Sequence, residues 1–132
     1  MKRVFVDTGA WYALVDSHDP DHRQAETFLK SNTLPMVTTN FVFDESVTLI
    51  KKRLGHHVAV EFGERLMKSP SVMVLPVEPR DQEEAWRIFS EYRDLDFTYT
   101  DCTSFAVMKR LSLVTAFAFD SHFTMMGFSL PS

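Results

Sequence analysis

Short apolar runs alternate along the chain with longer segments in which apolar residues recur every three or four positions. The short runs are typical of buried strands, and the longer segments are typical of amphipathic helices. We expect strands at residues 4–6, 35–39, 72–75 and 113–119, with 128–130 as a short fifth candidate. We expect helices at residues 10–15, 22–30, 41–54, 57–68, 81–92 and from 98 to about 111. Strands that alternate with helices favour crossover connections, so the predicted fold is α/β, a three-layer α/β/α sandwich with a mostly parallel, four- to five-stranded sheet.

The size and composition of the chain fit one globular domain. It has 132 residues, of which 45% are hydrophobic and 24% are charged, with no internal repeat or long linker. These fractions match an ordinary globular protein and argue against a disordered or fibrous chain. We therefore expect a single domain over residues 1–132.

Charge and cysteine content narrow the class of protein further. The 18 acids outnumber the 14 bases, so the formal charge is −4 and there is no basic footprint of a generic nucleic-acid binder. The single cysteine, Cys102, cannot form an internal disulfide. The start of the chain reaches Asp7 after only three apolar residues, unlike a signal peptide or a membrane span. We expect a cytoplasmic protein without membrane association.

Two of the predicted strands end in an aspartate. Asp7 follows residues 4–6, and Asp120 follows the run that ends at Phe119. Ligands of open parallel sheets bind outside the carboxyl ends of the strands, so both acids lie at the edge where function is expected. Asp101 and Glu45 would join them if their helices start at that edge. Taken singly, each acid has a simpler explanation as a turn residue, a helix-start residue or an exposed carboxylate.

A cluster of carboxylates would need compensation. Two of them about 4 Å apart repel by roughly 4 kcal/mol at an effective dielectric constant near 20. They must share protons or hold a cation. Oxygen ligands of this kind suit hard divalent ions such as Mg²⁺ or Mn²⁺, which also bridge to phosphate oxygens. The pattern indicates phosphoryl chemistry.

Four segments of the chain, taken in order, carry a family resemblance. They are residues 4–11 (VFVDTGAW), 38–46 (TTNFVFDES), 99–108 (YTDCTSFAVM) and 118–123 (AFDSHF), followed by Gly127-Phe128. In this combination the chain resembles PIN-domain ribonucleases over essentially its whole length, and within them the VapC toxins of prokaryotic toxin–antitoxin pairs.

The resemblance implies a set of site residues. The carboxylates that would hold Mg²⁺ or Mn²⁺ are Asp7, Glu45, Asp101 and Asp120. Periodicity does not choose Glu45 over Asp44, and the choice comes from the family's pattern. Small hydroxyls that could orient water or substrate fall at Thr8, Thr100 and Ser104, where they could equally serve as helix caps or turn formers.

The resemblance also implies a function. The chain would be a metal-dependent endoribonuclease that hydrolyses RNA phosphodiester bonds to 5′-phosphate and 3′-hydroxyl products, with a metal-activated water and no covalent nucleophile. It would be the toxin of a pair, a homodimer that binds a small antitoxin protein. Once a metal compensates the negative charge of the four ligands, RNA could approach over the basic side chains at 51–53 or 109–110. These side chains could equally belong to solvated helix faces. We do not expect a steep salt dependence.

Other interpretations remain to be separated from this one. The first alternative is a PIN-fold module that binds RNA or a protein without cutting. The turn Asp7-Thr8-Gly9 also occurs in retroviral-type aspartic proteases, but those are nearly all-β. A dehalogenase-like nucleophile would need an aspartate where Gly9 stands.

Most other chemically active or aromatic side chains are assigned to structural roles. The closeness of His122 to Asp120 in sequence does not indicate a catalytic triad, because a triad requires side chains that converge in space. On the helix expected at 81–92, the inward positions are Ala85, Ile88, Phe89 and Tyr92. Trp11, Tyr12 and Trp86 are expected mostly in the core, although some exposed aromatic surface would suit a dimer or an antitoxin.

Overall fold

A computed structural model describes residues 2–131 of the chain. Its strands are β1 (Val4–Val6), β2 (Met36–Thr39), β3 (Val72–Leu75) and β4 (Thr115–Phe117). Its helices are α1 (Thr8–Val15), α2 (His22–Ser31), α3 (Asn40–Leu54), α4 (His56–Lys68), α5 (Pro79–Glu91), α6 (Tyr99–Arg110) and α7 (His122–Met125). The predicted alternation of strands and helices is confirmed, and α7 is an addition to it.

The four strands form one parallel sheet in the order β3-β2-β1-β4. Val4 at the start of β1 pairs with Met36 of β2 on one side and with Thr115 of β4 on the other. Every residue of β1 is buried, as expected for a central parallel strand covered on both faces. The segment 128–130 does not form a full fifth strand, because Ser129 makes only an isolated bridge to Thr115.

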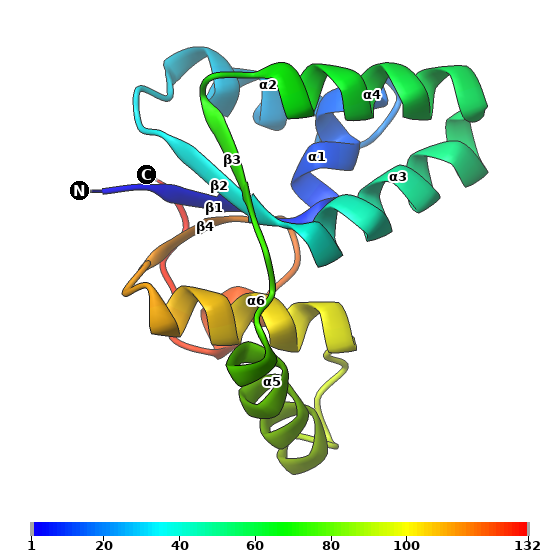
Figure 1. The fold of residues 1–132 in the computed structure, drawn as a ribbon. Coiled ribbons are helices and arrows are strands. Elements are labelled where there is room, and N and C mark those ends of the chain that lie inside the picture. The colour runs from blue at the N-terminus through cyan, green and yellow to red at the C-terminus, as the bar shows by residue number, and fades with distance from the viewer. Residues whose placement is uncertain (1, 132) are drawn as a thin grey trace.

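Helices cover both faces of the sheet and give the three predicted layers. Helices α1 to α4 lie on one side, and α5 and α6 lie on the other (Figure 1). On the α6 side the core contains the rings of Phe5, Phe105 and Phe123, with the last two 5.0 Å apart in an edge-to-face arrangement. Because all strands are parallel, β1 and β2 run into α1 and α3 at the same edge of the sheet, where α6 also begins.

The last strand is shorter than predicted. The apolar run 113–119 contributes only Thr115–Phe117 to the sheet. Leu113 instead belongs to the turn that follows α6, where its N–H bonds back to the carbonyl of Met108 and Ser112 has a φ of +56°. Beyond the strand, the ring of Phe119 packs 5.2 Å from that of Phe117. The apolar run therefore combines a helix end, a strand and a buried loop.

Helix α5 buries less of its surface than the periodicity predicted. Ala85 and Ile88 are buried, but Phe89 and Tyr92 are exposed and Trp86 is 62% exposed. The prediction that Phe89 and Tyr92 point inward was wrong, and so was the expectation that Trp86 lies in the core. The physical reason is that α5 packs chiefly on α6, so a narrow strip of its surface meets the rest of the protein.

An ion pair fastens α5 to α6. The guanidinium of Arg110 donates to both carboxylate oxygens of Asp81, at 2.7 and 2.9 Å, and Asp81 is only 2% exposed. Burial alone would disfavour the charge, but the hydrogen bonds from Arg110 and from the Glu78 N–H hold the pKa of Asp81 below its usual value. Lys109 likewise contacts Glu84 at 3.2 Å. Both bases of residues 109–110 are thus engaged with acids of their own protein.

Candidate active site

Asp7 lies at the junction between β1 and α1. Its N–H continues the sheet by bonding to the carbonyl of Phe117, and its carbonyl accepts from the N–H groups of Ala10 and Trp11 in the first turn of α1. The backbone is thereby fixed from both sides, and the side chain is 4% exposed. The Oδ1 atom of Asp7 is buried with no hydrogen-bond partner among residues 2–131. A buried carboxylate oxygen left in this state calls for a ligand or a proton.

Asp101 lies in the first turn of α6 and takes part in a capping box with Thr98. The hydroxyl of Thr98 accepts from the Asp101 N–H, while Asp101 Oδ2 accepts from the Thr98 N–H, both at 3.0 Å. The same Oδ2 atom lies 2.8 Å from Nδ1 of His122. Because these bonds end on Oδ2, the other oxygen of Asp101 is left for a further ligand.

Asp120 lies on the loop after β4, beside the start of α7. Its Oδ1 accepts from the backbone N–H of His122 at 3.0 Å, and its Oδ2 lies 3.7 Å from His122 Nδ1. The imidazole thus stands between the carboxylates of Asp101 and Asp120, with its ring edge-to-face against Phe97 at 5.4 Å. Donor atoms of Asp101, Asp120 and His122 all fall within 4.8 Å of one another.

Glu45 approaches from α3 and is held by Thr8. The hydroxyl of Thr8 donates to Glu45 Oε1 at 2.5 Å, and Thr8 is itself buried in the first turn of α1. Glu45 is half-buried, whereas the neighbouring Asp44 is exposed. The helix is set in place by its N-cap, where the hydroxyl of Thr39 accepts from the Val42 N–H at 3.1 Å. Glu45 and Asp44 therefore differ in environment although they are adjacent in sequence.

The acids interact electrostatically. Burial raises the pKa of Asp7 well above its usual value, and repulsion from the carboxylates of Asp101, Asp120 and Glu45 raises it further. Burial likewise raises the pKa of Asp101; the Thr98 N–H opposes this and Asp120 adds to it. The other three carboxylates named from the sequence therefore lie near enough to Asp7 to repel its charge, and of the four only Asp101 and Asp120, together with His122, have donor atoms within 4.8 Å of one another among residues 2–131.

The donor set fits a hard divalent cation. Glu45 of α3, Asp101 of α6 and Asp120 of the loop after β4 all act electrostatically on Asp7, at the junction of β1 and α1. Asp7 has a bare buried oxygen, and no basic side chain is bonded to Asp7 or Glu45 among residues 2–131. Mg²⁺ and Mn²⁺ prefer such oxygen ligands. The three-donor group that includes His122 Nδ1 is less suited to Mg²⁺, because that nitrogen already faces Asp101.

The other two hydroxyls named from the sequence have different surroundings. Ser104 is fully buried and donates to the carbonyl of Thr100 at 3.1 Å, so its hydroxyl is used inside α6. Thr100 is half-buried in the first turn of α6, next to Asp101. Of the three hydroxyls, Thr8 is the one with a hydrogen bond to a site carboxylate.

Sequence reasoning missed His122 as a site residue. Its closeness to Asp120 along the chain was not informative, because the contact that matters is with Asp101, 21 residues earlier. The available signal was the position of His122 just after a strand-end acid. That placement brings it to the same edge of the sheet as the carboxylates.

A separate cavity of about 520 Å³ lies away from the acids. It is lined mainly by apolar side chains of α1, α2 and α4, including Trp11, Leu29, Val58 and Phe62. None of the four carboxylates lines it. Cavity size alone would therefore point away from the acidic site, and the chemistry of the side chains is the better guide to it.

Comparisons with known proteins identify the family to which this fold and candidate site belong. The PIN domain family model matches residues 4–128, and the chain belongs to the PIN-domain family. It is 34% identical over 125 residues to the 23S rRNA-specific endonuclease VapC20 of Mycobacterium tuberculosis, and the match covers 95% of both chains.

Solved structures agree with the fold. The crystal structure of M. tuberculosis VapC20, described as a sarcin-ricin loop cleaving toxin, superposes with a TM-score of 0.90 at 34% identity over 95% of both chains. FitAcB from Neisseria gonorrhoeae matches with a TM-score of 0.72 at 18% identity, covering 98% of this chain and 96% of that one. VapBC2 from Rickettsia felis, bound to a promoter DNA fragment, matches with a TM-score of 0.70 at 10% identity, covering 98% and 97%. At these lower identities the two matches bear on the fold alone. Within residues 2–131, no helix is long and apolar enough to cross a bilayer.

Proposed function

We propose that this protein is a divalent-metal-dependent endoribonuclease and the toxin of a toxin–antitoxin pair, acting through a single PIN domain over residues 1–132. The observation that carries the proposal is a buried oxygen of Asp7 that has no hydrogen-bond partner among residues 2–131 and lies close enough to Asp101, Asp120 and Glu45 for their charges to repel it. A 34% identical relative named as a 23S rRNA-specific endonuclease supports it.

The four carboxylates would hold Mg²⁺ or Mn²⁺. When bound, the ion would supply Lewis-acid chemistry, lowering the pKa of water and offsetting negative charge that develops at phosphorus. Neighbouring residues of this chain hold two of the carboxylates in position. Thr8 holds Glu45 by a hydrogen bond, and the capping box fixes Asp101 relative to the start of α6.

His122 positions Asp101 and does not act as a nucleophile. Its Nδ1–H donates to Asp101 Oδ2 and so fixes which carboxylate oxygen turns toward the ligand. The low exposure of Asp7 and Asp101 reduces the contact of their carboxylates with bulk solvent and strengthens electrostatic interactions there. Water would attack phosphorus, the bond to the 3′ oxygen would break, and that oxygen would leave with a proton. The products would carry a 5′-phosphate and a 3′-hydroxyl.

The substrate class follows from the relatives. We propose structured RNA as the substrate, with an exposed loop of ribosomal RNA as the first candidate, because the relative VapC20 is named as 23S rRNA-specific and its crystal structure as that of a sarcin-ricin loop cleaving toxin. We also propose a small antitoxin protein as partner, a homodimer, and a cytoplasmic site of action.

The deciding experiment sequences RNA ends after incubation of the purified protein with total RNA. Wild type with Mg²⁺ or Mn²⁺ is expected to give new, discrete 5′-phosphate ends, and EDTA or Asp7→Asn is expected to abolish them. Asp44→Asn is the matched control, because Asp44 is exposed beside Glu45. Ends that survive both EDTA and Asp7→Asn would end the nuclease proposal, and tight RNA binding without any cutting would favour a non-cleaving module.

The toxin role has its own test. Expression of the wild type in a bacterial host is expected to arrest growth, and Asp7→Asn is expected to relieve the arrest. Free growth under strong wild-type expression would contradict the toxin role while leaving the nuclease chemistry intact.

A further inference from the structure

The two central strands of the sheet separate before the first of them ends. Within residues 2–131, the register between β1 and β2 does not reach Val6, the last residue of β1. On its other side Val6 is still paired with Phe117 of β4, and β2 continues beside β3 as far as Thr39. The ladder between β1 and β2 is thus interrupted just before Asp7, at the edge of the sheet that carries the acids.

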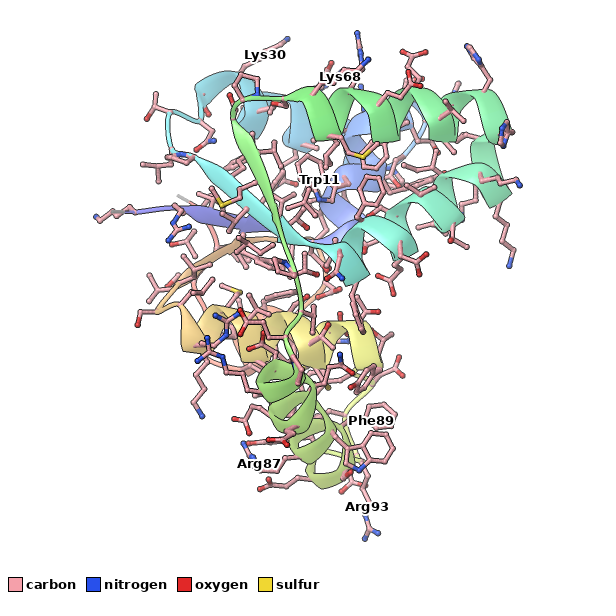
Figure 2. The ribbon with its side chains drawn as sticks, in the orientation of Figure 1. Trp11, Lys30, Lys68, Arg87, Phe89 and Arg93 are labelled. Atoms are coloured by element: carbon pink, nitrogen blue, oxygen red, sulfur yellow. The ribbon has the colours of Figure 1, made fainter. Side chains whose placement is uncertain are left out.

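The side chain of Thr38 occupies this interruption. Its hydroxyl donates to the carbonyl of Val6 at 2.9 Å, and the indole Nε1–H of Trp11 donates to the same hydroxyl oxygen at 3.5 Å. Thr38 and Val6 are completely buried, and Trp11 of α1 lies in the interior beside the strands (Figure 2). A buried carbonyl needs a hydrogen-bond partner, and here the Thr38 hydroxyl replaces the partner that a continued ladder would supply.

These contacts hold the backbone on both sides of Asp7. The Val6 carbonyl belongs to the peptide group that precedes Asp7, and the N–H of that group bonds to the Phe117 carbonyl at 3.1 Å. The same peptide group is therefore held by β2 through Thr38 and by β4 through Phe117. Beyond Asp7, the N–H of Trp11 bonds to the Asp7 carbonyl at 3.1 Å, while its indole returns to Thr38. The hydroxyl of Thr38 thus links the residues before and after Asp7.

Thr38 also connects Asp7 to the helix that carries Glu45. The residue that follows Thr38 is Thr39, the N-cap of α3, and Glu45 lies in the second turn of that helix. A shift of the end of β1 relative to β2 would therefore change the position of Asp7 relative to Glu45. The two carboxylates repel each other, so without a cation they favour a wider separation.

We propose that Thr38 is a positioning residue of the metal site, whose hydroxyl holds the end of β1 against β2 so that Asp7 and Glu45 can share one cation. This inference rests on the proposed metal-dependent function. Carboxylates that are already held in place lose less freedom when a cation binds, so the hydroxyl raises the metal affinity without touching the metal. Thr8 acts differently, because it bonds to the Glu45 carboxylate itself.

A purely structural role of the hydroxyl makes a different prediction. If the hydroxyl only satisfies the buried Val6 carbonyl, its loss lowers the free energy of unfolding but leaves the metal affinity of the folded protein unchanged. If the hydroxyl positions Asp7, its loss also weakens metal binding at a temperature where the variant is fully folded. Stability and metal affinity measured on the same variants therefore separate the two roles.

The test compares Thr38→Val with Thr38→Ser. The metal-free proteins are titrated with Mn²⁺ in a calorimeter, at a temperature where circular dichroism shows each of them to be folded. Thr38→Val keeps the shape but loses the hydroxyl, and it is expected to bind Mn²⁺ roughly 3- to 10-fold more weakly than wild type, the range for loss of one hydrogen bond. Thr38→Ser keeps the hydroxyl and is expected to bind within about twofold of wild type. Thr38→Ala, which also lacks the hydroxyl, replaces the valine variant if that variant does not fold.

Thr103→Val is the matched control. Thr103 is also completely buried, but its hydroxyl donates to the Thr100 carbonyl within α6, and that carbonyl also accepts from the Ser104 hydroxyl. Its loss is expected to lower stability and to leave the Mn²⁺ affinity within about twofold of wild type. In RNA cleavage, Thr38→Val is expected to need more Mn²⁺ for its half-maximal rate with an unchanged KM for RNA, because Thr38 is completely buried and out of reach of the substrate.

Two results would overturn the inference. The first is a Mn²⁺ affinity of Thr38→Val equal to that of wild type, which would leave the hydroxyl a structural role alone. The second is an equal loss of affinity in Thr38→Val and Thr103→Val, which would make weaker binding a general effect of losing a buried hydroxyl. Either result leaves the proposed function in place if wild type binds Mn²⁺ and cuts RNA. A wild type that neither binds Mn²⁺ nor cuts RNA would overturn the proposed function, and this inference with it.

Discussion

Two buried aspartates occupy opposite environments in this protein. Asp81 is 2% exposed and receives two hydrogen bonds from Arg110, and its pKa is lowered. Asp7 is 4% exposed, has an oxygen without a partner and faces other carboxylates, and its pKa is raised. The ionised carboxylate of Asp81 thus stabilises the contact between α5 and α6, whereas the ionised carboxylate of Asp7 is destabilised by its surroundings, although both are buried. Such a destabilised charge is characteristic of a binding or catalytic site.

The largest change in the free energy of unfolding is expected when the ion pair between Asp81 and Arg110 is broken. Arg110→Met leaves the buried Asp81 charge without its partner and is expected to lower the free energy of unfolding by about 3–5 kcal/mol. Urea unfolding followed by circular dichroism measures this. Adding Asp81→Asn to Arg110→Met is expected to restore part of the loss, because it removes the stranded charge.

The exposed pair provides the control for that measurement. Arg87→Met removes contacts to Glu84 and Glu91, but Arg87 is 53% exposed in its side chain, so its loss is expected to be far smaller. Equal losses for Arg87→Met and Arg110→Met would contradict the distinction drawn from burial.

The corresponding change at the other buried aspartate, Asp7→Asn, is expected to stabilise the folded protein. In EDTA at neutral pH, Asp7→Asn is expected to raise the free energy of unfolding by about 1–2 kcal/mol, because it removes a buried charge that has like-charged neighbours. Since the pKa of Asp7 is raised in the folded state, its ionisation destabilises the fold as pH rises from the unfolded value of about 3.9 through the folded one. The gain from Asp7→Asn should therefore shrink as pH falls toward 4.

Asp81 provides the opposite pH trend. Its folded pKa is lowered, so its contribution is present above the unfolded value of about 3.9 and is lost as pH falls through the folded pKa. Denaturant unfolding of wild type, Asp7→Asn and Asp81→Asn between pH 3 and 8 compares the two. A wild type more stable than Asp7→Asn in EDTA at pH 7 would contradict the account of Asp7.

A smaller effect is expected from the groups that hold the carboxylates. His122→Ala removes the contact to Asp101 Oδ2 and is expected to reduce kcat/KM by about tenfold, the effect of roughly 1.4 kcal/mol. His122→Asn, which retains a donor near that position, should recover part of the loss. No change in either variant would remove His122 from the positioning role.

The smallest effect is expected at Thr8. Thr8→Val keeps the shape but removes the hydrogen bond to Glu45, and the loss is expected to be about 1 kcal/mol, or a few-fold in kcat/KM. Thr100→Val is the comparison, because within residues 2–131 the hydroxyl of Thr100 makes no hydrogen bond to a carboxylate of the candidate site, whereas that of Thr8 does. A larger loss for Thr100→Val than for Thr8→Val would reverse their assigned roles.

Some of this could be predicted from sequence, for identifiable reasons. Asp7 and Asp120 were named because strand ends in a parallel sheet share an edge, and Asp101 and Glu45 were added on the condition that their helices start at that edge. The choice of Glu45 over Asp44 needed the family resemblance, since both lie on one helical turn. The structure adds that Glu45 bonds to Thr8 while Asp44 is exposed.

Other features depended on packing that local patterns do not encode. Trp86 and Phe89 have the composition of a core face, yet they remain exposed because α5 meets chiefly α6. His122 gains its role from a contact with Asp101 across the fold. The fate of the run 113–119 depended on where α6 ended, which the apolar pattern alone does not mark.

Calorimetric titration of the metal-free protein with Mn²⁺ tests the central claim most directly. Wild type and Asp44→Asn are expected to bind with the same affinity, while Asp7→Asn and Asp101→Asn are expected to bind at least tenfold more weakly. Equal Mn²⁺ affinity in wild type and Asp7→Asn would show that the four carboxylates do not form one cation site.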